Sequence, residues 1–313
     1  MKKCLVTGGA GFIGSHIVEK LVERGDTVRV LDNFSSGKKE NLETVQDQIE
    51  IVRGDLRNET DLKKAVKGID LIFHQAAFVS VPLSIEDPDQ CFQTNVAGTI
   101  NLLSAAVKAQ VKRVVLASSA AVYGDNPAVP LVEEAELNPL SPYAASKQVG
   151  EIYTGIYSNH LDLEVVALRY FNVYGQKQNP DSDYAAVIPI FIKNMLAGEQ
   201  PTIYGDGLQS RDFIFVTDVV RANLLASESN LSSGKTINIC SGSEINLLQL
   251  TETLSEIFGR GSQPNFEKER PGDIYRSSGN PSLAREILNF ETLVDLPTGL
   301  RDTVNWMADS PLN

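Results

Sequence analysis

The chain has 313 residues and a formal net charge of -12, from 28 Lys+Arg against 40 Asp+Glu. An acidic chain lacks the basic face that nucleic-acid binding requires, so that class of partner is excluded. The composition, 42% hydrophobic and 22% charged, is that of a globular protein long enough for about two domains. Because no apolar stretch approaches the roughly 20 residues of a membrane helix, we expect a soluble protein without a signal peptide or membrane partner.

The first half of the chain alternates short apolar runs with segments of helical periodicity. Runs rich in β-branched residues predict strands, and apolar residues recurring at helical spacing predict helices. The expected strands are 3–7, 27–31, 49–52, 71–74, 113–118 and 163–168, and the expected helices are 12–22, 59–66, a long one around 91–109, and 144–157. This alternation predicts an α/β fold with a doubly wound parallel sheet of the Rossmann type, covered on both faces.

After about residue 170 the pattern loosens, with a loop expected at 179–183. Helical periodicity returns at 216–226, 247–258, 283–288 and 300–307, with a strand at 236–239. The layout predicts a dinucleotide-binding domain over 1–170 and about 216–240. A smaller, interleaved C-terminal portion, about 171–215 and 241–313, is expected to bind the substrate.

A glycine-rich turn joins the first strand to the first helix. Glycines in the run TGGAGFIG at 7–14 permit a tight turn, let the backbone approach a pyrophosphate and place it at the helix N-terminus. Asp32 follows Gly14 by 18 residues, where an acidic residue binds the adenosine ribose. A carboxylate accepts from a 2′-hydroxyl and repels a 2′-phosphate, so NAD is favoured over NADP. The alternative is a structural turn with a chance aspartate.

Two further positions have competing interpretations. Asp55 and Leu56 follow the third strand, where a side chain can contact adenine, but the pair can also cap a helix. Tyr143 and Lys147 lie at i and i+4, on one helical face. A nearby ammonium and a cationic nicotinamide ring both lower the pKa of a phenol, so the two residues can form a tuned acid/base, although this spacing also occurs on ordinary helix surfaces.

These motifs, in this order, resemble the extended short-chain dehydrogenases/reductases, and within them the nucleotide-sugar 4-epimerases. The resemblance covers nearly the whole chain. The residues that carry it are TGGAGFIGS at 7–15, DNFSSGKKENL at 32–42, GDL at 54–56, HQAA at 74–77, TNVAGT at 94–99, SSAAVYG at 118–124, PYAASK at 142–147, RYFNVYG at 169–175, YGDGLQSRDFIFV at 204–216 and RPGD at 270–273.

The resemblance implies an NAD site and a catalytic triad of Ser119, Tyr143 and Lys147. Ser119 would hydrogen-bond the sugar O4, Tyr143 would take its proton, and Lys147 would hold the nicotinamide ribose and lower the tyrosine pKa. Hydride would pass from C4 to NAD and return to the other face of a rotated 4-ketose. The implied cofactor-binding residues are Gly8, Gly11, Phe12, Ile13, Gly14, Asp32, Asn33, Ser35, Ser36, Gly37, Asp55, Leu56, Gln75, Ala76, Ala77, Tyr143 and Lys147.

One departure from other branches of the family is informative. Nucleotide-sugar 4,6-dehydratases carry an acidic residue beside the catalytic Ser or Thr, but here Ala120 and Ala121 follow Ser119. Dehydration, and the related decarboxylation, are therefore disfavoured, and reversible oxidation at C4 remains.

The resemblance also implies substrate-binding residues for a UDP-sugar. Arg211 and Arg270 would clamp the diphosphate, since guanidinium groups match phosphate geometry. Asn172 would contact the phosphate–sugar region, Val187 and Tyr204 would flank uracil, and Asp273 would accept from the nucleotide ribose. Arg211 can instead form a surface pair with Asp212, and Tyr204 can be a core aromatic.

The resemblance also aligns Ser277 with the pocket-wall position at which glucose-restricted epimerases of the family carry a bulky tyrosine. A small residue leaves room for a 2-acetamido group, so we expect UDP-N-acetylglucosamine and UDP-N-acetylgalactosamine to interconvert alongside UDP-glucose and UDP-galactose. Ser119 is expected to contact the same sugar.

Two other functions remain open on the sequence alone. A 4-keto reductase or dehydrogenase of the same fold would use the same triad but release its cofactor, and a non-catalytic NAD-binding regulator would not need the triad. The resemblance implies a homodimer paired through the helices around 91–109 and 146–157. The three cysteines, far apart and odd in number, predict reduced core residues in a cytoplasmic protein, and no metal is expected because the three histidines lack ligand spacing.

Overall fold

The computed structural model describes residues 1–180, 186–261, 263–269 and 274–309. Its centre is a seven-stranded parallel sheet with the order β10-β6-β5-β4-β1-β2-β3. The strands are β1 (Lys3–Thr7), β2 (Thr27–Asp32), β3 (Ile49–Arg53), β4 (Leu71–His74), β5 (Arg113–Ser119), β6 (Glu164–Tyr170) and β10 (Thr236–Ile239). The predicted Rossmann-type fold is confirmed, and every expected strand of the sheet is present.

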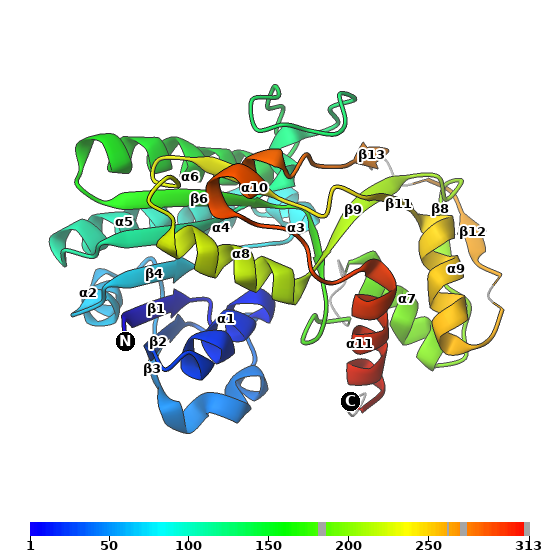
Figure 1. Cartoon of the computed structure of the whole chain (residues 1–313), viewed down its shortest axis with the longest axis horizontal. Helices are drawn as coiled ribbons and strands as arrows, with labels where there is room; N and C mark the ends of the chain where they lie inside the picture. Colours follow the sequence, from blue (N-terminus) through cyan, green and yellow to red (C-terminus); the bar gives the residue numbers. More distant parts are fainter. Residues whose placement is uncertain (181–185, 262, 270–273, 310–313) are drawn as a thin grey trace.

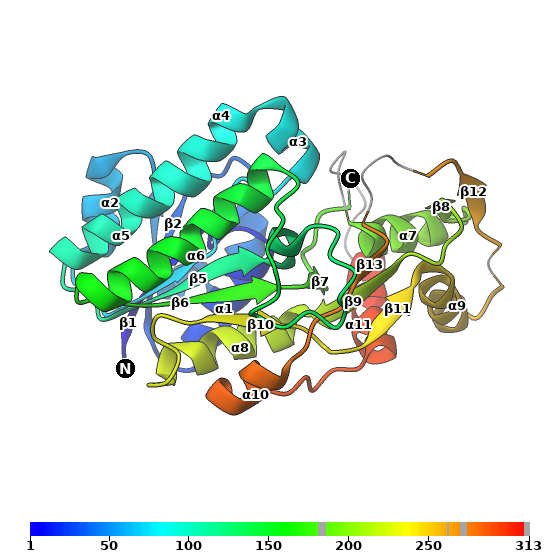
Figure 2. The ribbon, with the colours of Figure 1, turned by 90° about the horizontal axis from the view of Figure 1, so that it is seen from above.

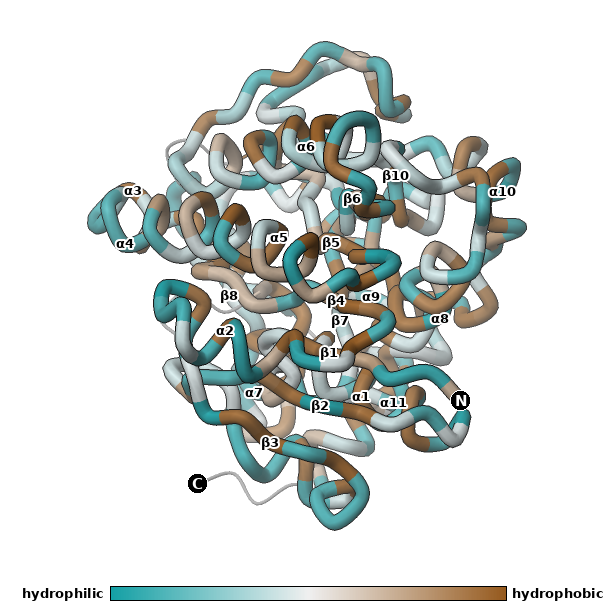
Figure 3. The backbone as a smooth tube through the Cα atoms, turned by 90° about the vertical axis from the view of Figure 1, so that its left-hand side faces the viewer, coloured by the Kyte–Doolittle hydropathy of each residue, from teal (hydrophilic) through white to brown (hydrophobic). Residues whose placement is uncertain are grey.

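Helices cover both faces of this sheet (Figures 1 and 2). One face packs on α1 (Phe12–Glu23), the 3₁₀ segment η1 (Lys39–Gln48), α8 (Val216–Glu228) and α10 (Ser282–Leu288). The other packs on α2 (Glu59–Val66), α5 (Gly98–Lys108) and α6 (Pro142–His160). Figure 3 shows brown, apolar residues along the central strands, as expected for a sheet buried on both faces.

A second lobe lies beyond the carboxyl ends of the strands, on the right in Figure 1. Strand β9 (Ser210–Phe215) pairs with β7 (Asn172–Tyr174), β11 (Glu244–Asn246) and β13 (Arg276–Ser277), and β8 (Thr202–Tyr204) pairs with β12 (Asn265–Glu267). Their core is closed by α7 (Val187–Leu196), α9 (Leu247–Phe258) and α11 (Leu296–Asp309). Although α10 is late in the chain, Ala284 and Leu288 on it pack into the core of the central sheet.

Two helical segments differ from the sequence-based expectation. The helix expected around 91–109 is divided into α4 (Pro88–Cys91), a π-helical stretch η2 (Phe92–Ala97) and α5, preceded by α3 (Val81–Glu86). Helix α7 was not predicted, although its buried residues Ile188, Phe191, Ile192 and Met195 recur at helical spacing. Within the described part of the chain, no helix is long and apolar enough to cross a membrane.

Candidate active site

The order of the strands reverses between β1 and β4, so the loops after these two strands diverge and leave a crevice where such folds bind nucleotides. The glycine loop leaves β1 at this point. Gly8 has φ +66°, and a Cβ there would lie 2.7 Å from backbone atoms of Ala76, after β4. A Cβ on Gly14 would lie 2.1 Å from the Gly8 carbonyl oxygen. Only glycine fits at these two positions. The resulting tight loop is the cradle that pyrophosphate binding requires.

The remaining loop residues begin α1. Gly11 is the N-cap, and its N–H donates to the Gly8 oxygen at 3.0 Å. Phe12 and Ile13 are half-buried against the cores of both lobes. Among the described residues no side chain caps α1, so its first N–H groups are available to an anion.

Asp32 ends β2 beside the glycine loop and is 7% exposed. Its two oxygens accept from the backbone N–H groups of Ala10, at 2.9 Å, and Phe34, at 2.8 Å. A carboxylate offers about four acceptor positions, so Asp32 holds the loop and keeps capacity for a ribose hydroxyl. A Cβ on Gly37 would lie 3.0 Å from an Asp32 oxygen, so the turn after β2 lies close to the Asp32 carboxylate. Within that turn Ser35 and Ser36 are exposed.

Asp55 lies on the neighbouring loop, and its carboxylate accepts from Asn33 Nδ2 at 2.9 Å and Arg57 Nη2 at 2.8 Å. The Arg57 hydrogen bond, the largest cause, lowers the pKa of this carboxyl. The alternative that Asp55 caps a helix is wrong, because Asn58 caps α2 by accepting from the N–H of Thr60 at 2.9 Å. Leu56 next to it is 5% exposed and its side chain packs in the core.

The three residues expected to be catalytic come together at the carboxyl end of β5. Ser119 ends that strand, and Tyr143 and Lys147 lie on the first turns of α6, which begins at Pro142 after the Ser141 N-cap. The Ser119 side chain hydrogen-bonds Tyr143. Lys147 Nζ donates to the Ala117 carbonyl of β5 at 2.8 Å and lies 5.7 Å from the Tyr143 ring centroid. Because β5 and α6 are adjacent layers, residues 24 positions apart in sequence form one cluster.

Burial dominates the electrostatics of this cluster. Burial is the largest cause acting on Tyr143 and raises its pKa, while the Ser119 hydrogen bond lowers it. The expected lowering of the phenol pKa depends on Lys147 together with a bound nicotinamide ring. In this structure Lys147 donates to a backbone carbonyl, and burial removes phenolate hydration. Burial also lowers the pKa of Lys147 to about 8, against Cys91 and Glu151, which raise it.

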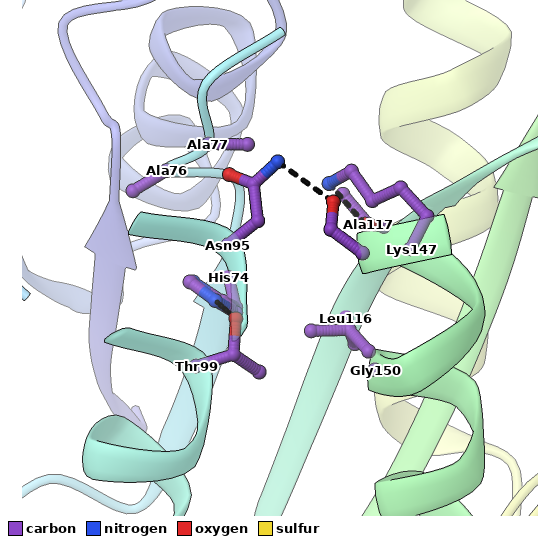
Figure 4. A pocket seen from close by; sticks show the side chains of 10 residues that line it. His74, Ala76, Ala77, Asn95, Thr99, Leu116, Ala117, Lys147 and Gly150 are labelled. Carbon is purple, nitrogen blue, oxygen red and sulfur yellow. Dashed lines mark hydrogen bonds between the residues drawn. The ribbon is translucent and has the colours of Figure 1, made fainter. Parts of the chain in front are cut away.

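A small pocket is lined by Lys147 and by residues of β4, η2, β5 and α6 (Figure 4). Asn95, from the π-helical stretch, points toward Ser146 and donates to its Oγ at 3.0 Å, and its Oδ1 accepts from the Phe78 N–H at 2.7 Å. His74 is held between Thr7 Oγ1, at 2.7 Å, and Thr99 Oγ1, at 2.9 Å. Burial lowers the pKa of His74 to about 3, so it stays neutral.

Sequence reasoning assigned no role to His74, Asn95 or Thr99, although the HQAA and TNVAGT runs contain them. Of the expected cofactor residues after β4, Ala76 and Ala77 line this pocket. Gln75 Nε2 donates to Tyr170 OH at 3.1 Å. The loop after β4 is thus bound to β6 and lies against the glycine loop.

The expected substrate residues lie on the second lobe. Arg211 and Ser277 are direct partners in the β9–β13 register. Asn172 opens β7, and its Nδ2 donates to the Asp212 carbonyl at 3.1 Å. Val187 is the first residue of α7, and Tyr204, half-buried, ends β8 on the separate two-stranded sheet. Arg270 and Asp273 lie outside the described residues.

The alternative that Arg211 pairs with Asp212 at the surface is wrong. Asp212 is fully buried, and its carboxylate accepts from the N–H and the Oγ of Ser241, both at 2.7 Å, and from the N–H of Gly242 at 2.9 Å. Burial raises the pKa of the Asp212 carboxyl to about 6, although these hydrogen bonds act to lower it. Because alternate residues of a strand face opposite ways, Asp212 anchors β9 while Arg211 faces the other side.

Comparison with known proteins agrees with this geometry. The model of the NAD dependent epimerase/dehydratase family matches residues 4–240. A UDP-glucose 4-epimerase of Mycolicibacterium smegmatis is 40% identical over 312 residues, 98% of this chain and 99% of that protein. The solved UDP-N-acetylglucosamine 4-epimerase of Methanobrevibacter ruminantium, in complex with UDP-N-acetylmuramic acid, is 42% identical with a TM-score of 0.94, covering 98% of each chain.

The chain is also similar to a protein of different activity. A UDP-N-acetyl-alpha-D-glucosaminuronate decarboxylase of Bacillus cytotoxicus is 34% identical over 320 residues, 98% of each chain. The family model, the matched fold and the fit of the glycine cradle confirm the expected NAD cofactor and an enzymatic role. The chain therefore belongs to the NAD-dependent epimerase/dehydratase family.

Proposed function

We propose that this protein is an NAD-dependent 4-epimerase of UDP-hexoses. It interconverts UDP-N-acetylglucosamine with UDP-N-acetylgalactosamine, and UDP-glucose with UDP-galactose. The observation that carries the proposal is the cluster of Ser119, Tyr143 and Lys147 at the carboxyl end of β5, the same edge of the sheet at which the glycine loop follows β1. The names of the similar proteins from M. smegmatis and M. ruminantium support the reaction class.

The chain's own residues handle the proton at the sugar O4. Ser119 holds O4 by a hydrogen bond, and Tyr143 takes the proton during oxidation and gives it back during reduction. NAD, when bound, accepts the C4 hydride and returns it. Because burial raises the pKa of Tyr143, the phenolate needs positive charge close by. The Lys147 ammonium, which would also hold the nicotinamide ribose when NAD is bound, supplies part of that charge.

Two alternatives are less consistent with the site. Decarboxylation or dehydration needs an acid beside Ser119, but Ala120 and Ala121, in the short helix η3 (Ala120–Tyr123), carry only methyl groups. A non-catalytic regulator would not need the hydrogen bond between Ser119 at the end of β5 and Tyr143 on α6. A 4-keto reductase or dehydrogenase would use the same cluster, and the fate of the cofactor distinguishes it.

We assign binding of the UDP-sugar to residues 171–215 and 241–313, and binding of NAD to 1–170 with 216–240. Arg211 is the described candidate for the diphosphate, with Asn172 nearby on β7, and Val187 and Tyr204 are the candidates for uracil. The pairing of Arg211 with Ser277 supports this assignment, because it places a phosphate-binding group next to the proposed sugar pocket wall. Arg270 and Asp273 complete the proposal by resemblance.

The decisive assay uses the purified protein without added NAD. We expect UDP-N-acetylglucosamine and UDP-glucose, in separate reactions, each to give its C4 epimer over many turnovers, measured by chromatography. Conversion that stops after one substrate molecule per protein molecule, or that requires added cofactor, would identify a reductase or dehydrogenase. No conversion, with NAD still bound, would identify the regulator.

Ser277→Tyr tests substrate selectivity. We expect the larger side chain to lower kcat/KM for the acetamido sugars about tenfold or more relative to the plain hexoses, because overpacking costs about 1–3 kcal/mol. Ser277→Ala, which keeps the space, should leave the ratio of the two activities near its starting value. Equal losses on both sugar classes in Ser277→Tyr would show that residue 277 does not contact the acetamido group.

We further propose a homodimer formed through α5 and α6, which lie side by side with one face uncovered (Figure 2). On and near this face large apolar side chains are exposed: Phe92 by 51%, Ile152 by 56% and Ile156 by 40%. Such a patch on two adjacent helices suits a self-complementary interface. A monomeric mass in light scattering would contradict it. All three cysteines are free and buried, which supports a cytoplasmic location.

A further inference from the structure

A buried ion pair lies directly behind the proposed catalytic cluster. Glu151 is on α6 one turn beyond Lys147, and Arg169 is on β6 beneath that helix. Their side chains are only 6% and 5% exposed. The contact is bidentate, with Arg169 Nε donating to one carboxylate oxygen and Nη2 to the other, each at 2.8 Å. A pair this deeply buried needs good geometry to be tolerated.

Hydrogen bonds connect this pair to β5, which carries Ser119, and to η3. Ser118, next to Ser119, donates its hydroxyl to Glu151 Oε1 at 2.5 Å, and Ser118 and Arg169 are partners in the β5–β6 register. Arg169 Nη1 donates to Tyr123 OH at 2.6 Å. Glu151 therefore ties α6 to the ends of both β5 and β6, and Arg169 ties them to η3.

We propose that Glu151 and Arg169 are a positioning pair for catalysis. The pair fixes α6 on β5 so that Tyr143 meets Ser119 and Lys147 reaches the Ala117 carbonyl, and the Glu151 carboxylate keeps Lys147 in its cationic form. The catalytic part of this inference rests on the proposed epimerase function. The charge part concerns Lys147 itself and is testable without it.

The charge argument follows from the groups that face Lys147. These are Tyr143 and Glu151 from α6, Cys91 from α4 and His74 from β4, of which His74 is neutral. Burial lowers the pKa of Lys147 to about 8, while Cys91 and Glu151 raise it. Loss of the Glu151 charge lowers the Lys147 pKa further, and loss of the Arg169 charge leaves the carboxylate unopposed and raises it.

The test compares Glu151→Gln with Arg169→Met. We expect the alkaline limb of the kcat profile to move down by about one pH unit in Glu151→Gln and to move up in Arg169→Met. A merely structural pair would impair both variants without opposite shifts. The pH midpoint for acylation of Lys147 by acetic anhydride, read by peptide mass spectrometry, should shift in the same two directions.

Either single variant leaves a buried charge without its partner and can fail to fold. The double variant, Glu151→Gln with Arg169→Met, removes both charges and keeps the proposal testable. Its labelling midpoint should lie below that of the unaltered protein and above that of Glu151→Gln. A midpoint equal to that of the unaltered protein would overturn the charge role.

Glu164→Gln is the matched control. Glu164 and Arg113 form an ion pair between β6 and β5, at the ends of these strands opposite to Arg169 and Ser118. Loss of the Glu164 charge should leave the pH midpoint for Lys147 labelling unchanged. A shift in this control as large as that in Glu151→Gln would also overturn the proposal. If the opposite shifts occur in a protein that does not epimerise UDP-sugars, the proposed function fails while the charge role of the pair stands.

Discussion

Tyr143→Phe is expected to lower kcat for C4 epimerisation by about 10²–10⁴-fold, the usual contribution of a positioned acid/base. The variant keeps the ring but loses the hydroxyl that hydrogen-bonds Ser119 and that, in the proposed mechanism, exchanges the O4 proton. NAD should stay bound, because the glycine loop and Lys147 are untouched. Steady-state rates on both sugar pairs and the absorbance of bound cofactor measure the two effects separately.

Tyr153→Phe is the matched control for this variant. Tyr153 lies on the same helix and packs against Tyr157, with ring centroids 6.1 Å apart, away from Ser119. Its loss of a hydroxyl should change kcat less than about twofold, as expected for a position outside the reacting groups. If Tyr143→Phe were as active as this control, Tyr143 would not be the acid/base.

Gly14→Ala should have the second large effect, on the cofactor. The added Cβ would lie 2.1 Å from the Gly8 oxygen and 2.9 Å from Gly9 Cα, so the turn between β1 and α1 must move. Overpacking against rigid backbone costs about 1–3 kcal/mol or more. We expect a lower melting temperature and at least a tenfold weaker affinity for NAD, measured by calorimetry on protein stripped of cofactor.

Gly261→Ala separates loss of the cradle from loss of a glycine. Gly261 is exposed, and a Cβ there meets no atom within 4 Å among its surroundings. Its affinity for NAD should match that of the unaltered protein. Unchanged NAD affinity in Gly14→Ala would mean that the turn relaxes without disturbing the cofactor and that Gly14 serves only packing.

The sequence could predict those features that depend on local pattern. Apolar runs and helical periodicity place the seven strands of the central sheet, and the glycine run places the cradle between β1 and α1. The spacing of Tyr143 and Lys147 predicts a shared helical face, because four residues are about one helical turn. The short strands of the second lobe lack such periodicity, since their form depends on partners distant in the chain.

Tertiary structure alone decides the electrostatics of the site. Whether Tyr143 has a raised or lowered pKa depends on how completely it is buried and on where Lys147 donates, and neither follows from the YxxxK spacing. Likewise Asp212, adjacent to Arg211 in sequence, is an internal anchor because β9 turns it inward.

The sequence by itself determined the family resemblance, the fold and the candidates for the reacting side chains, because each depends on residue types at short, regular spacing. Only the tertiary structure showed that Glu151 and Arg169 meet behind those side chains. Two charged residues 18 positions apart carry no local signal of pairing, and it is the packing of α6 on β6 that removes both from water and makes them partners.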